Sequence, residues 1–307
     1  MIGIQLKGRL GNQMFQYAVA RTLADKLGCA LAFAGNTRGP RFGLIGHWIG
    51  LDKHLSERQQ NGVLRTAFQR GPNFWEGRAV ELALPLLKSL LFPRSFTPRK
   101  VEVIDGVFAE EFDPAIFRQT SGTWLMGYFQ SEKYFAANAD QVHHWFRPDR
   151  NAALRVEELM TQWPYRREQM AALHLRRGDY ARQKKGLDES GQGWLLPISY
   201  YHDALAEIPG DVGLAVFSDD PNWAAHQFSH RKCWISRGNP AVVDMFLIAQ
   251  CRWNVIANSS FSWWAAWLNM HSDKIVLAPK YHLGWRIGRW YHRGIEVAGW
   301  NYLQVAG

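Results

Sequence analysis

The sequence predicts an α/β protein with parallel sheets, divided into two domains. In its C-terminal half, short apolar stretches alternate with segments whose apolar residues recur at helical spacing. The connections between them are short, which is typical of strands and helices that form a parallel sheet covered on both faces. The length of 307 residues fits two domains of ordinary size, which we place at residues 1–160 and 161–307.

The N-terminal half begins with a strand, a turn and a helix. The strand is predicted at residues 2–6, the glycine-containing turn at 7–12 and the helix at 13–27. Later in this half we expect a strand and then a helix, at residues 123–129 and 131–145. Residues 35–100 contain one candidate helix, at 82–91, and no motif that assigns them a role.

The C-terminal half alternates regularly. Its predicted strands lie at residues 171–175, 214–218, 233–236, 253–257 and 274–278. Its predicted helices lie at 199–208, from Pro221, from Pro240 with Asn239 as N-cap, and at 260–269. Open parallel sheets bind ligands at the carboxyl ends of their strands. The polar segments that follow three of these strands, residues 176–185, 219–220 and 258–262, are therefore expected on one rim.

The amino-acid composition indicates which classes of partner and which cellular location to expect. The chain has 36 Lys and Arg against 27 Asp and Glu, and this net charge of +9 favours a phosphorylated small molecule, a polyanion or an acidic membrane surface. Its three cysteines show no C-x-x-C spacing, so a cytoplasmic location is simplest. The N-terminus lacks the pattern of a signal peptide, and no apolar stretch reaches the roughly 20 residues that span a bilayer. Any membrane contact is expected to be peripheral, on the inner membrane.

The segment from His174 to Asp179 carries the strongest chemical signal. Residues two apart in a strand face the same way, so His174 and Arg176 share a face and Arg177 points to the other. The planar Arg fork donates two parallel hydrogen bonds to a diphosphate and keeps its charge at physiological pH. An isolated Arg pair is more often a surface ion pair, here with Asp179 as neighbour. The position at the end of a strand favours phosphate binding.

A second signal lies at Asn258 to Trp264, where a strand ends and a helix begins. Free backbone N–H groups and the positive end of the helix dipole favour an anion there, and Ser259 and Ser260 can add donors. The alternative is that one serine only caps the helix and that Phe261 and the tryptophans form core.

Two adjacent carboxylates, Asp219 and Asp220, follow another predicted strand. They can accept hydrogen bonds from a guanine edge, or merely cap the helix from Pro221. No Asp-x-Asp pair occurs in the chain, so no metal is expected. The turn Gly8 to Gln13 suits close approach to a ligand, but it lacks the features of a P-loop or a dinucleotide fingerprint.

Taken together, four blocks resemble the bacterial α-1,2-fucosyltransferases of glycosyltransferase family 11 in order and approximate spacing. They are Gly8 to Tyr17, His174 to Tyr180, Phe217 to Pro221 and Asn258 to Trp264. The resemblance implies a GT-B-like fold, in which two Rossmann-like domains with parallel sheets face each other across a cleft. The N-terminal domain would mainly serve the acceptor, and the C-terminal domain would bind GDP-fucose.

The resemblance also implies roles for single residues. Arg176 should contact the β-phosphate, and His174 should lie near the nucleoside. Asp219 should recognise guanine, with Asp220 as the alternative. Ser259, Ser260 and Phe261 should surround the phosphates of the donor. The glycine loop should also contact the donor, through Arg9, Gly11 and Asn12, and Asn12 should reach the reaction centre.

The implied reaction is an inverting transfer of fucose to the 2-hydroxyl of a terminal galactose, in lipopolysaccharide, capsule or a free oligosaccharide, without metal or other cofactor. Asp179 is the nearest candidate base, and Glu110, Glu111 and Asp113 are others. A transferase for another GDP-sugar is the nearest alternative. A nucleic-acid-binding protein is another, suggested by the charge and the basic cluster Arg176, Arg177, Arg182, Lys184 and Lys185, and a lectin is a third. Under the leading hypothesis, no nucleic acid is expected as a partner.

Overall fold

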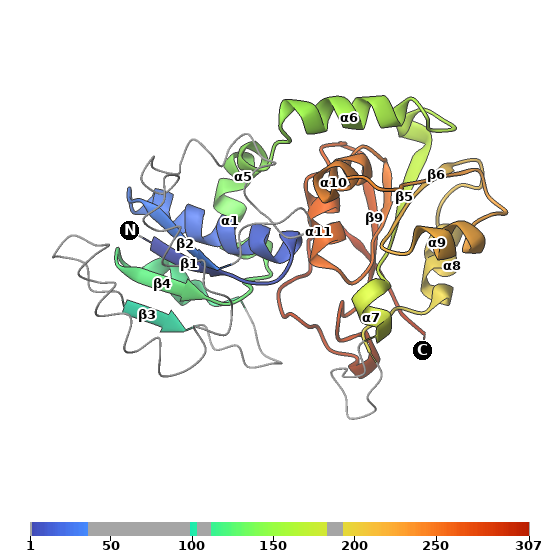
Figure 1. Ribbon diagram of the computed structural model, residues 1–307. Coiled ribbons are helices and arrows are strands. Elements are labelled where there is room, and N and C mark those ends of the chain that lie inside the picture. The colour runs from blue at the N-terminus through green and yellow to red at the C-terminus, as the bar shows by residue number, and fades with distance from the viewer. Residues whose placement is uncertain (1, 36–98, 103–111, 183–192, 307) are drawn as a thin grey trace. The chain divides into compact units, whose positions relative to one another are not determined.

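The computed structural model describes residues 2–35, 99–102, 112–182 and 193–306, and the statements below concern these residues (Figure 1). The chain forms two compact units, Met1–Arg147 and Pro148–Gly307. The division falls before the boundary expected at residue 160. The reason is that helix α6 (Arg150–Met160), which was not predicted, packs against α10 (Ala241–Ala249) of the second unit.

Unit 1 contains a parallel sheet with the strand order β2-β1-β4-β3. Its strands are β1 (Ile2–Leu6), β2 (Leu31–Gly35), β3 (Arg99–Glu102) and β4 (Thr123–Met126). Helix α1 (Leu10–Lys26) packs on β1 and is buried over most of its length. Its Phe15 ring lies 6.2 Å from Phe135, and its Tyr17 ring lies 5.8 Å from Trp145. These rings join α1 to the segment after β4.

Two predictions for unit 1 need correction. The turn after β1 is shorter than residues 7–12, because α1 already begins at Leu10 and includes Gly11 and Asn12. Gly8, with φ +74°, makes the reversal. The helix predicted at 131–145 is wrong as one helix: its residues form the 3₁₀ turns Glu132–Tyr134 and Ala136–Asn138 and then α5 (Ala139–Trp145). Phe135 leaves the helical conformation and buries its ring instead. The candidate helix at 82–91 lies outside the described residues.

Unit 2 contains a six-stranded parallel sheet with the order β10-β9-β8-β5-β6-β7. Its strands are β5 (Met170–Leu175), β6 (Gly213–Ser218), β7 (Cys233–Ile235), β8 (Trp253–Val255), β9 (Ile275–Pro279) and β10 (Asn301–Leu303). This is the strand order of a doubly wound sheet, with its switch point between β5 and β8. The final strand, β10, was not predicted.

Helices cover both faces of this sheet, which confirms the prediction of a doubly covered parallel sheet. Helices α8 (Ile198–Ala206) and α9 (Pro221–Gln227) lie on one side, and α10 and α11 (Ser260–Trp267) lie on the other (Figure 1). Leu173 and Leu175 of β5 belong to the core under α8 and α9, whereas Val276 and Ala278 of β9 pack with Ala266 of α11.

Two local features of unit 2 differ from the prediction. The basic segment after β5 is not wholly a loop, because Gly178–Arg182 forms the short helix α7. The N-cap of α10 is Pro240 rather than Asn239. The Asn239 amide donates to Ser236 Oγ at 3.0 Å, so it does not cap the helix.

The helices are short. The longest in the described ranges is α1, with 17 residues. Within those ranges no helix is both long and apolar enough to cross a membrane. The predicted peripheral membrane contact stays a prediction.

Candidate functional site

The predicted rim of unit 2 lies at the switch point of its sheet. Strand β5 pairs with β6 on one side and with β8 on the other. The helices that follow β5 and β6 pack on one face of the sheet, and α11, which follows β8, packs on the opposite face. The segments that leave the carboxyl ends of β5, β6 and β8 therefore meet at the position where open sheets bind ligands. These are the segments that contain Arg176, Asp219 and Ser259.

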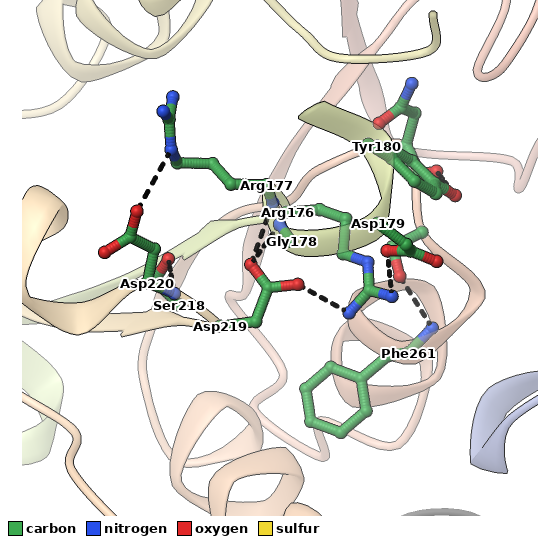
Figure 2. Close-up of polar contacts among 11 residues, drawn as sticks. Arg176, Arg177, Gly178, Asp179, Tyr180, Ser218, Asp219, Asp220 and Phe261 are labelled. Atoms are coloured by element: carbon green, nitrogen blue, oxygen red, sulfur yellow. Dashed lines mark hydrogen bonds and ion pairs between the residues drawn. The ribbon is translucent and has the colours of Figure 1, made fainter. Parts of the chain in front are cut away.

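Asp219 holds the segment that follows β5 (Figure 2). Its Oδ1 accepts hydrogen bonds from the backbone N–H groups of Arg177 at 2.9 Å and Gly178 at 3.0 Å. Its Oδ2 lies 2.9 Å from Nη1 of Arg176. A Cβ atom on Gly178 would lie 2.6 Å from Asp219 Oδ2, so a glycine is needed for this approach. This role of Asp219 was not predicted from the sequence.

Arg176 is held on three sides. Besides Asp219, its Nη2 lies 2.5 Å from Asp179 Oδ1, and its guanidinium carbon lies 5.4 Å from the centre of the Tyr180 ring. Only 15% of the Arg176 side chain is exposed, against 42% for Asp179. Two carboxylates and an aromatic ring thus fix the plane of the guanidinium. The more exposed Asp179 is the partner that a ligand could replace most easily.

Arg177 points the other way, as strand alternation predicts. Its guanidinium carbon stacks 3.6 Å from the centre of the Trp223 ring, and its Nε lies 3.7 Å from Asp220 Oδ2. Asp220 is the N-cap of α9, because its Oδ1 accepts from the backbone N–H of Trp223 at 3.2 Å. Figure 2 shows this pair directed away from Arg176. Arg177 and Asp220 therefore fasten α9, as the alternative interpretation of Asp220 proposed.

His174 is a buried neutral imidazole. Its residue is 6% exposed, and its ring lies 5.3 Å from that of Phe261. Burial lowers the pKa of His174 to about 4, although the Asp219 carboxylate acts in the opposite direction. Within the described residues, its Nδ1 has no hydrogen-bond partner. One polar atom at this rim thus remains to meet a ligand or a water molecule.

The segment after β8 combines a helix cap with a polar anchor. Ser259 is the N-cap of α11, and its Oγ accepts from the backbone N–H of Phe261 at 3.4 Å. The Asn258 side chain donates to the carbonyl oxygen of Trp194 at 2.7 Å, and the Tyr180 hydroxyl donates to the Asn258 carbonyl oxygen at 3.2 Å. Ser260 follows as the first residue of α11. The residues that tie the segments together, Tyr180, Asn258 and Trp194, were missed as such.

The tryptophans of α11 are core, as the alternative interpretation of this segment proposed. Trp263, Trp264 and Trp267 are all buried, and the indole N–H of Trp263 donates to the carbonyl oxygen of Ile295 at 2.8 Å. This packing fixes the helix axis. It does not contradict an anion site, because the N-terminus of a helix can bind an anion while its remaining turns lie in the core.

The other predicted donor-loop residues belong to unit 1. Arg9 is the N-cap of α1, and Gly11 and Asn12 lie in the first turn of that helix. The Gln130 side-chain amide donates to Asn12 Oδ1 at 2.9 Å. The approach of these residues to the site in unit 2 stays a prediction.

Of the alternative bases, the structure describes Asp113 alone. Asp113, in unit 1, accepts from the backbone N–H of Ala115 at 2.8 Å and caps a 3₁₀ turn. Glu110 and Glu111 lie outside the described residues. Asp179 is therefore the one candidate base that the structure describes beside Arg176.

A further carboxyl, that of the partly buried Asp244, was not predicted as functional. It lies in the first turn of α10, and the Ser236 hydroxyl, just after β7, donates to its Oδ1 at 2.5 Å. Burial raises the pKa of Asp244 to about 7, and its hydrogen bonds with Ser236 and Asn239 oppose this shift. In the sequence it interrupts an apolar stretch, which is the only signal that marks it.

The expected absence of a metal and the nucleic-acid alternative both concern groups of charged residues. Among the described residues, no three His, Cys, Asp or Glu side chains gather as a metal site would need; the expected independence of metal stays a prediction. In the basic cluster, Arg176 and Arg177 are both engaged with carboxylates and aromatic rings. Lys184 and Lys185 of that cluster lie outside the described residues.

Similarity to known proteins agrees with the resemblance seen in the four blocks. An O-antigen biosynthesis glycosyltransferase of Escherichia coli, WbnK, is 28% identical over 90% of this chain and 92% of its own length. An α-1,2-colitosyltransferase of Escherichia coli is 30% identical over 90% of each chain. The crystal structure of POFUT1 in complex with GDP-fucose is similar in fold, with a TM-score of 0.55 at 12% identity, over 90% of this chain and 97% of that one. Residues 110–304 match the profile of glycosyl transferase family 11, and the chain belongs to that family.

Proposed function

We propose that this glycosyltransferase transfers L-fucose from GDP-β-L-fucose to the 2-hydroxyl of a terminal galactose, with inversion and without a metal ion. The observation that supports it most is the fixed guanidinium of Arg176 at the switch point of a parallel sheet in a family 11 protein. The acceptor would be an oligosaccharide or a surface glycan. The names of the two E. coli relatives support an O-antigen context and a 1,2-linkage.

The proposed architecture is GT-B-like, with two Rossmann-like domains whose parallel sheets face each other across a cleft. The N-terminal domain would mainly serve the acceptor, and the C-terminal domain would bind the donor. The parallel sheets of the two units and the similarity in fold to POFUT1 support this assignment. In the second unit, the doubly wound strand order supports a nucleotide at the ends of β5 and β8.

Charge stabilisation would be the main catalytic device. As the bond to fucose breaks, negative charge grows on the departing diphosphate. Arg176 would donate a fork of hydrogen bonds to the β-phosphate, and the N-terminus of α11, with Ser259, Ser260 and Phe261, would add backbone donors. A phosphate oxygen would replace the exposed Asp179 carboxylate as partner of Arg176, which would free Asp179 to accept the proton of the acceptor hydroxyl.

Recognition of guanine is proposed for the same rim, with His174 near the nucleoside. The predicted reader, Asp219, already accepts two backbone hydrogen bonds and pairs with Arg176, and Asp220 already caps α9. Either would have to exchange a partner to bind the base. Comparing GDP with IDP, which lacks the 2-amino group, tests this directly: a variant of the true reader loses the preference for GDP. If neither variant loses it, Asp219 and Asp220 are not the readers.

The deciding experiment incubates the purified protein with GDP-fucose and a panel of galactosides, including lactose, and determines the linkage of the product. An α-1,2-fucosyl galactoside formed equally well in the presence of EDTA supports the proposal. Transfer that stops with EDTA and returns with a divalent cation contradicts metal independence. A product of another linkage contradicts the regiochemistry, and absence of both transfer and GDP binding overturns the function.

A second candidate is transfer of a different sugar from its GDP derivative. The 30% identity with a colitosyltransferase favours this alternative specifically. Competition between GDP-fucose and the GDP derivatives of colitose and mannose, compared as kcat/KM, separates the candidates. A higher kcat/KM for another sugar would replace fucose as the proposed substrate.

A further inference from the structure

The two groups proposed to hold the diphosphate lie beyond the paired parts of their strands. Arg176 follows β5, and Ser259, the N-cap of α11, follows β8. The pairing of β5 with β8 ends where Leu173 lies opposite Val255, and both segments continue past that pair before they reach these residues. Strand pairing therefore does not by itself set the distance between the guanidinium of Arg176 and the first turn of α11.

One side chain, that of Tyr180 in α7, contacts both segments. Its ring centre lies 5.4 Å from the guanidinium carbon of Arg176. Its hydroxyl donates to the carbonyl oxygen of Asn258 at 3.2 Å, and Asn258 directly precedes the N-cap of α11. Burial raises the pKa of Tyr180 above its usual value, so the hydroxyl keeps its proton and stays a donor at neutral pH. Tyr180 thus joins the cation after β5 to the helix N-terminus after β8.

Trp194 holds the partners of this hydrogen bond in place. Its ring packs edge-on against the ring of Tyr180, with 5.6 Å between the ring centres and 75° between the planes. The side-chain amide of Asn258, a residue that is 0% exposed, donates to the Trp194 carbonyl oxygen at 2.7 Å. Tyr180, Asn258 and Trp194 therefore form a closed set of contacts. In such a set the hydroxyl and the carbonyl oxygen that accepts from it are each held by a second neighbour.

We infer that Tyr180 is a positioning residue that sets the spacing between Arg176 and the N-terminus of α11, so that both can bind one diphosphate. The inference rests on the proposed function, in which these two groups hold the diphosphate of GDP-fucose. The two phosphates of a diphosphate have a nearly fixed separation, so both sets of donors are satisfied together only when their own separation matches it. A spacing that is set before the substrate arrives lowers the cost of binding and places the donors for the charge that develops.

Tyr180→Phe tests this, because it keeps the ring beside Arg176 and removes only the hydrogen bond to Asn258. We expect the Kd of GDP to rise roughly 5- to 10-fold, the factor that one neutral hydrogen bond contributes. GMP has a single phosphate and cannot bridge the two donors, so its Kd should change less than about 2-fold. The preference for GDP over GMP should therefore fall. Tyr302→Phe is the control, because that hydroxyl accepts from the backbone N–H of Val297 at 2.7 Å in the same unit; its preference should equal that of the wild type.

A double-mutant cycle with Arg176→Lys separates positioning from a general loss of fold. If Tyr180 acts by matching two sets of donors, Tyr180→Phe should lower the preference for GDP over GMP less in the Arg176→Lys background than in the wild type. Additive effects on this preference would overturn the inference. Equal weakening of GDP and GMP by Tyr180→Phe, as expected of a purely structural residue, would also overturn it, and so would an unchanged preference. A wild-type protein that neither binds GDP nor transfers fucose would instead overturn the proposed function.

Discussion

Replacement of Asp219 by asparagine should weaken catalysis much more than it weakens the fold. In the wild type, Oδ1 accepts from two backbone N–H groups and Oδ2 pairs with Arg176 at 2.9 Å. The asparagine oxygen can keep both backbone contacts. Its NH₂ group then faces the Arg176 guanidinium, and two donors repel each other there. Arg176 keeps Asp179 but loses the partner that fixes its plane.

The expected magnitude follows from the burial of this pair. Arg176 is 15% exposed and Asp219 is 28% exposed, so solvent screens their contact only in part. Hydrogen bonds to charged groups contribute about 1.5–3 kcal/mol. We take about 2 kcal/mol for the lost contact, which corresponds to a decrease of roughly 30-fold in kcat/KM at about 1.4 kcal/mol per factor of ten.

The assay compares kcat/KM for GDP-fucose, the Kd of GDP and the thermal midpoint of the variant. The matched control is Asp273→Asn, which removes the carboxylate of a surface ion pair with Arg252 at 2.9 Å. Wild-type kcat/KM combined with a lowered thermal midpoint would refute the reasoning, because Asp219 would then support the fold without orienting Arg176. Equal effects of the two substitutions on kcat/KM would refute it as well.

Three further substitutions give separate predictions. Gly178→Ala places a Cβ atom 2.6 Å from Asp219 Oδ2, so kcat/KM should fall at least as far as in Asp219→Asn. The control is Gly210→Ala, where a Cβ atom meets nothing within 4 Å. Equal kcat/KM values of the two alanine variants would contradict the prediction. Arg176→Lys keeps the charge but loses the fork, so kcat/KM should fall roughly 100-fold or more, and near wild-type activity would remove Arg176 from its central role. Burial raises the pKa of Asp244 from 3.8 to about 7, so the folded protein binds this proton more tightly than the unfolded chain does. The free energy of unfolding should therefore fall between about pH 4 and pH 7, by up to about 4 kcal/mol, and denaturation of Asp244→Asn should lack that part of the slope; an unchanged slope would show that other groups cause it.

Strand periodicity was enough to separate the two arginines of the site. Alternation continued past the end of β5 places Arg176 and Arg177 on opposite sides, and their partners, Asp219 and Asp220, are divided accordingly. The collection of polar segments at the carboxyl ends of β5, β6 and β8 also followed from the parallel order of strands. Both predictions depend on local regularities that repeat in every parallel sheet.

Contacts between residues far apart in the sequence could not be predicted from these local patterns. Asp219 meets Arg176 because β5 and β6 pair with Leu175 opposite Ser218, and no local pattern sets this register. Phe135 interrupts a stretch with helical spacing, since burial against Phe15 outweighs the helix preference of its neighbours. The hydrogen bond of Gln130 with Asn12 depends on a left-handed residue, Phe129, that the sequence does not mark.

Burial also fixes the charge of two groups at the rim of unit 2 near neutral pH. The pKa of His174 is lowered to about 4, and burial raises the pKa of Tyr180 above its usual value, so the imidazole and the phenol are both neutral at pH 7. Arg176 keeps its charge throughout this range. At this rim the charge of Arg176 is therefore constant around neutral pH, and the imidazole and the phenol beside it carry none. A guanidinium of constant charge, oriented by Asp219 before the substrate arrives, meets the requirement that charge stabilisation be in place when the bond to the sugar breaks.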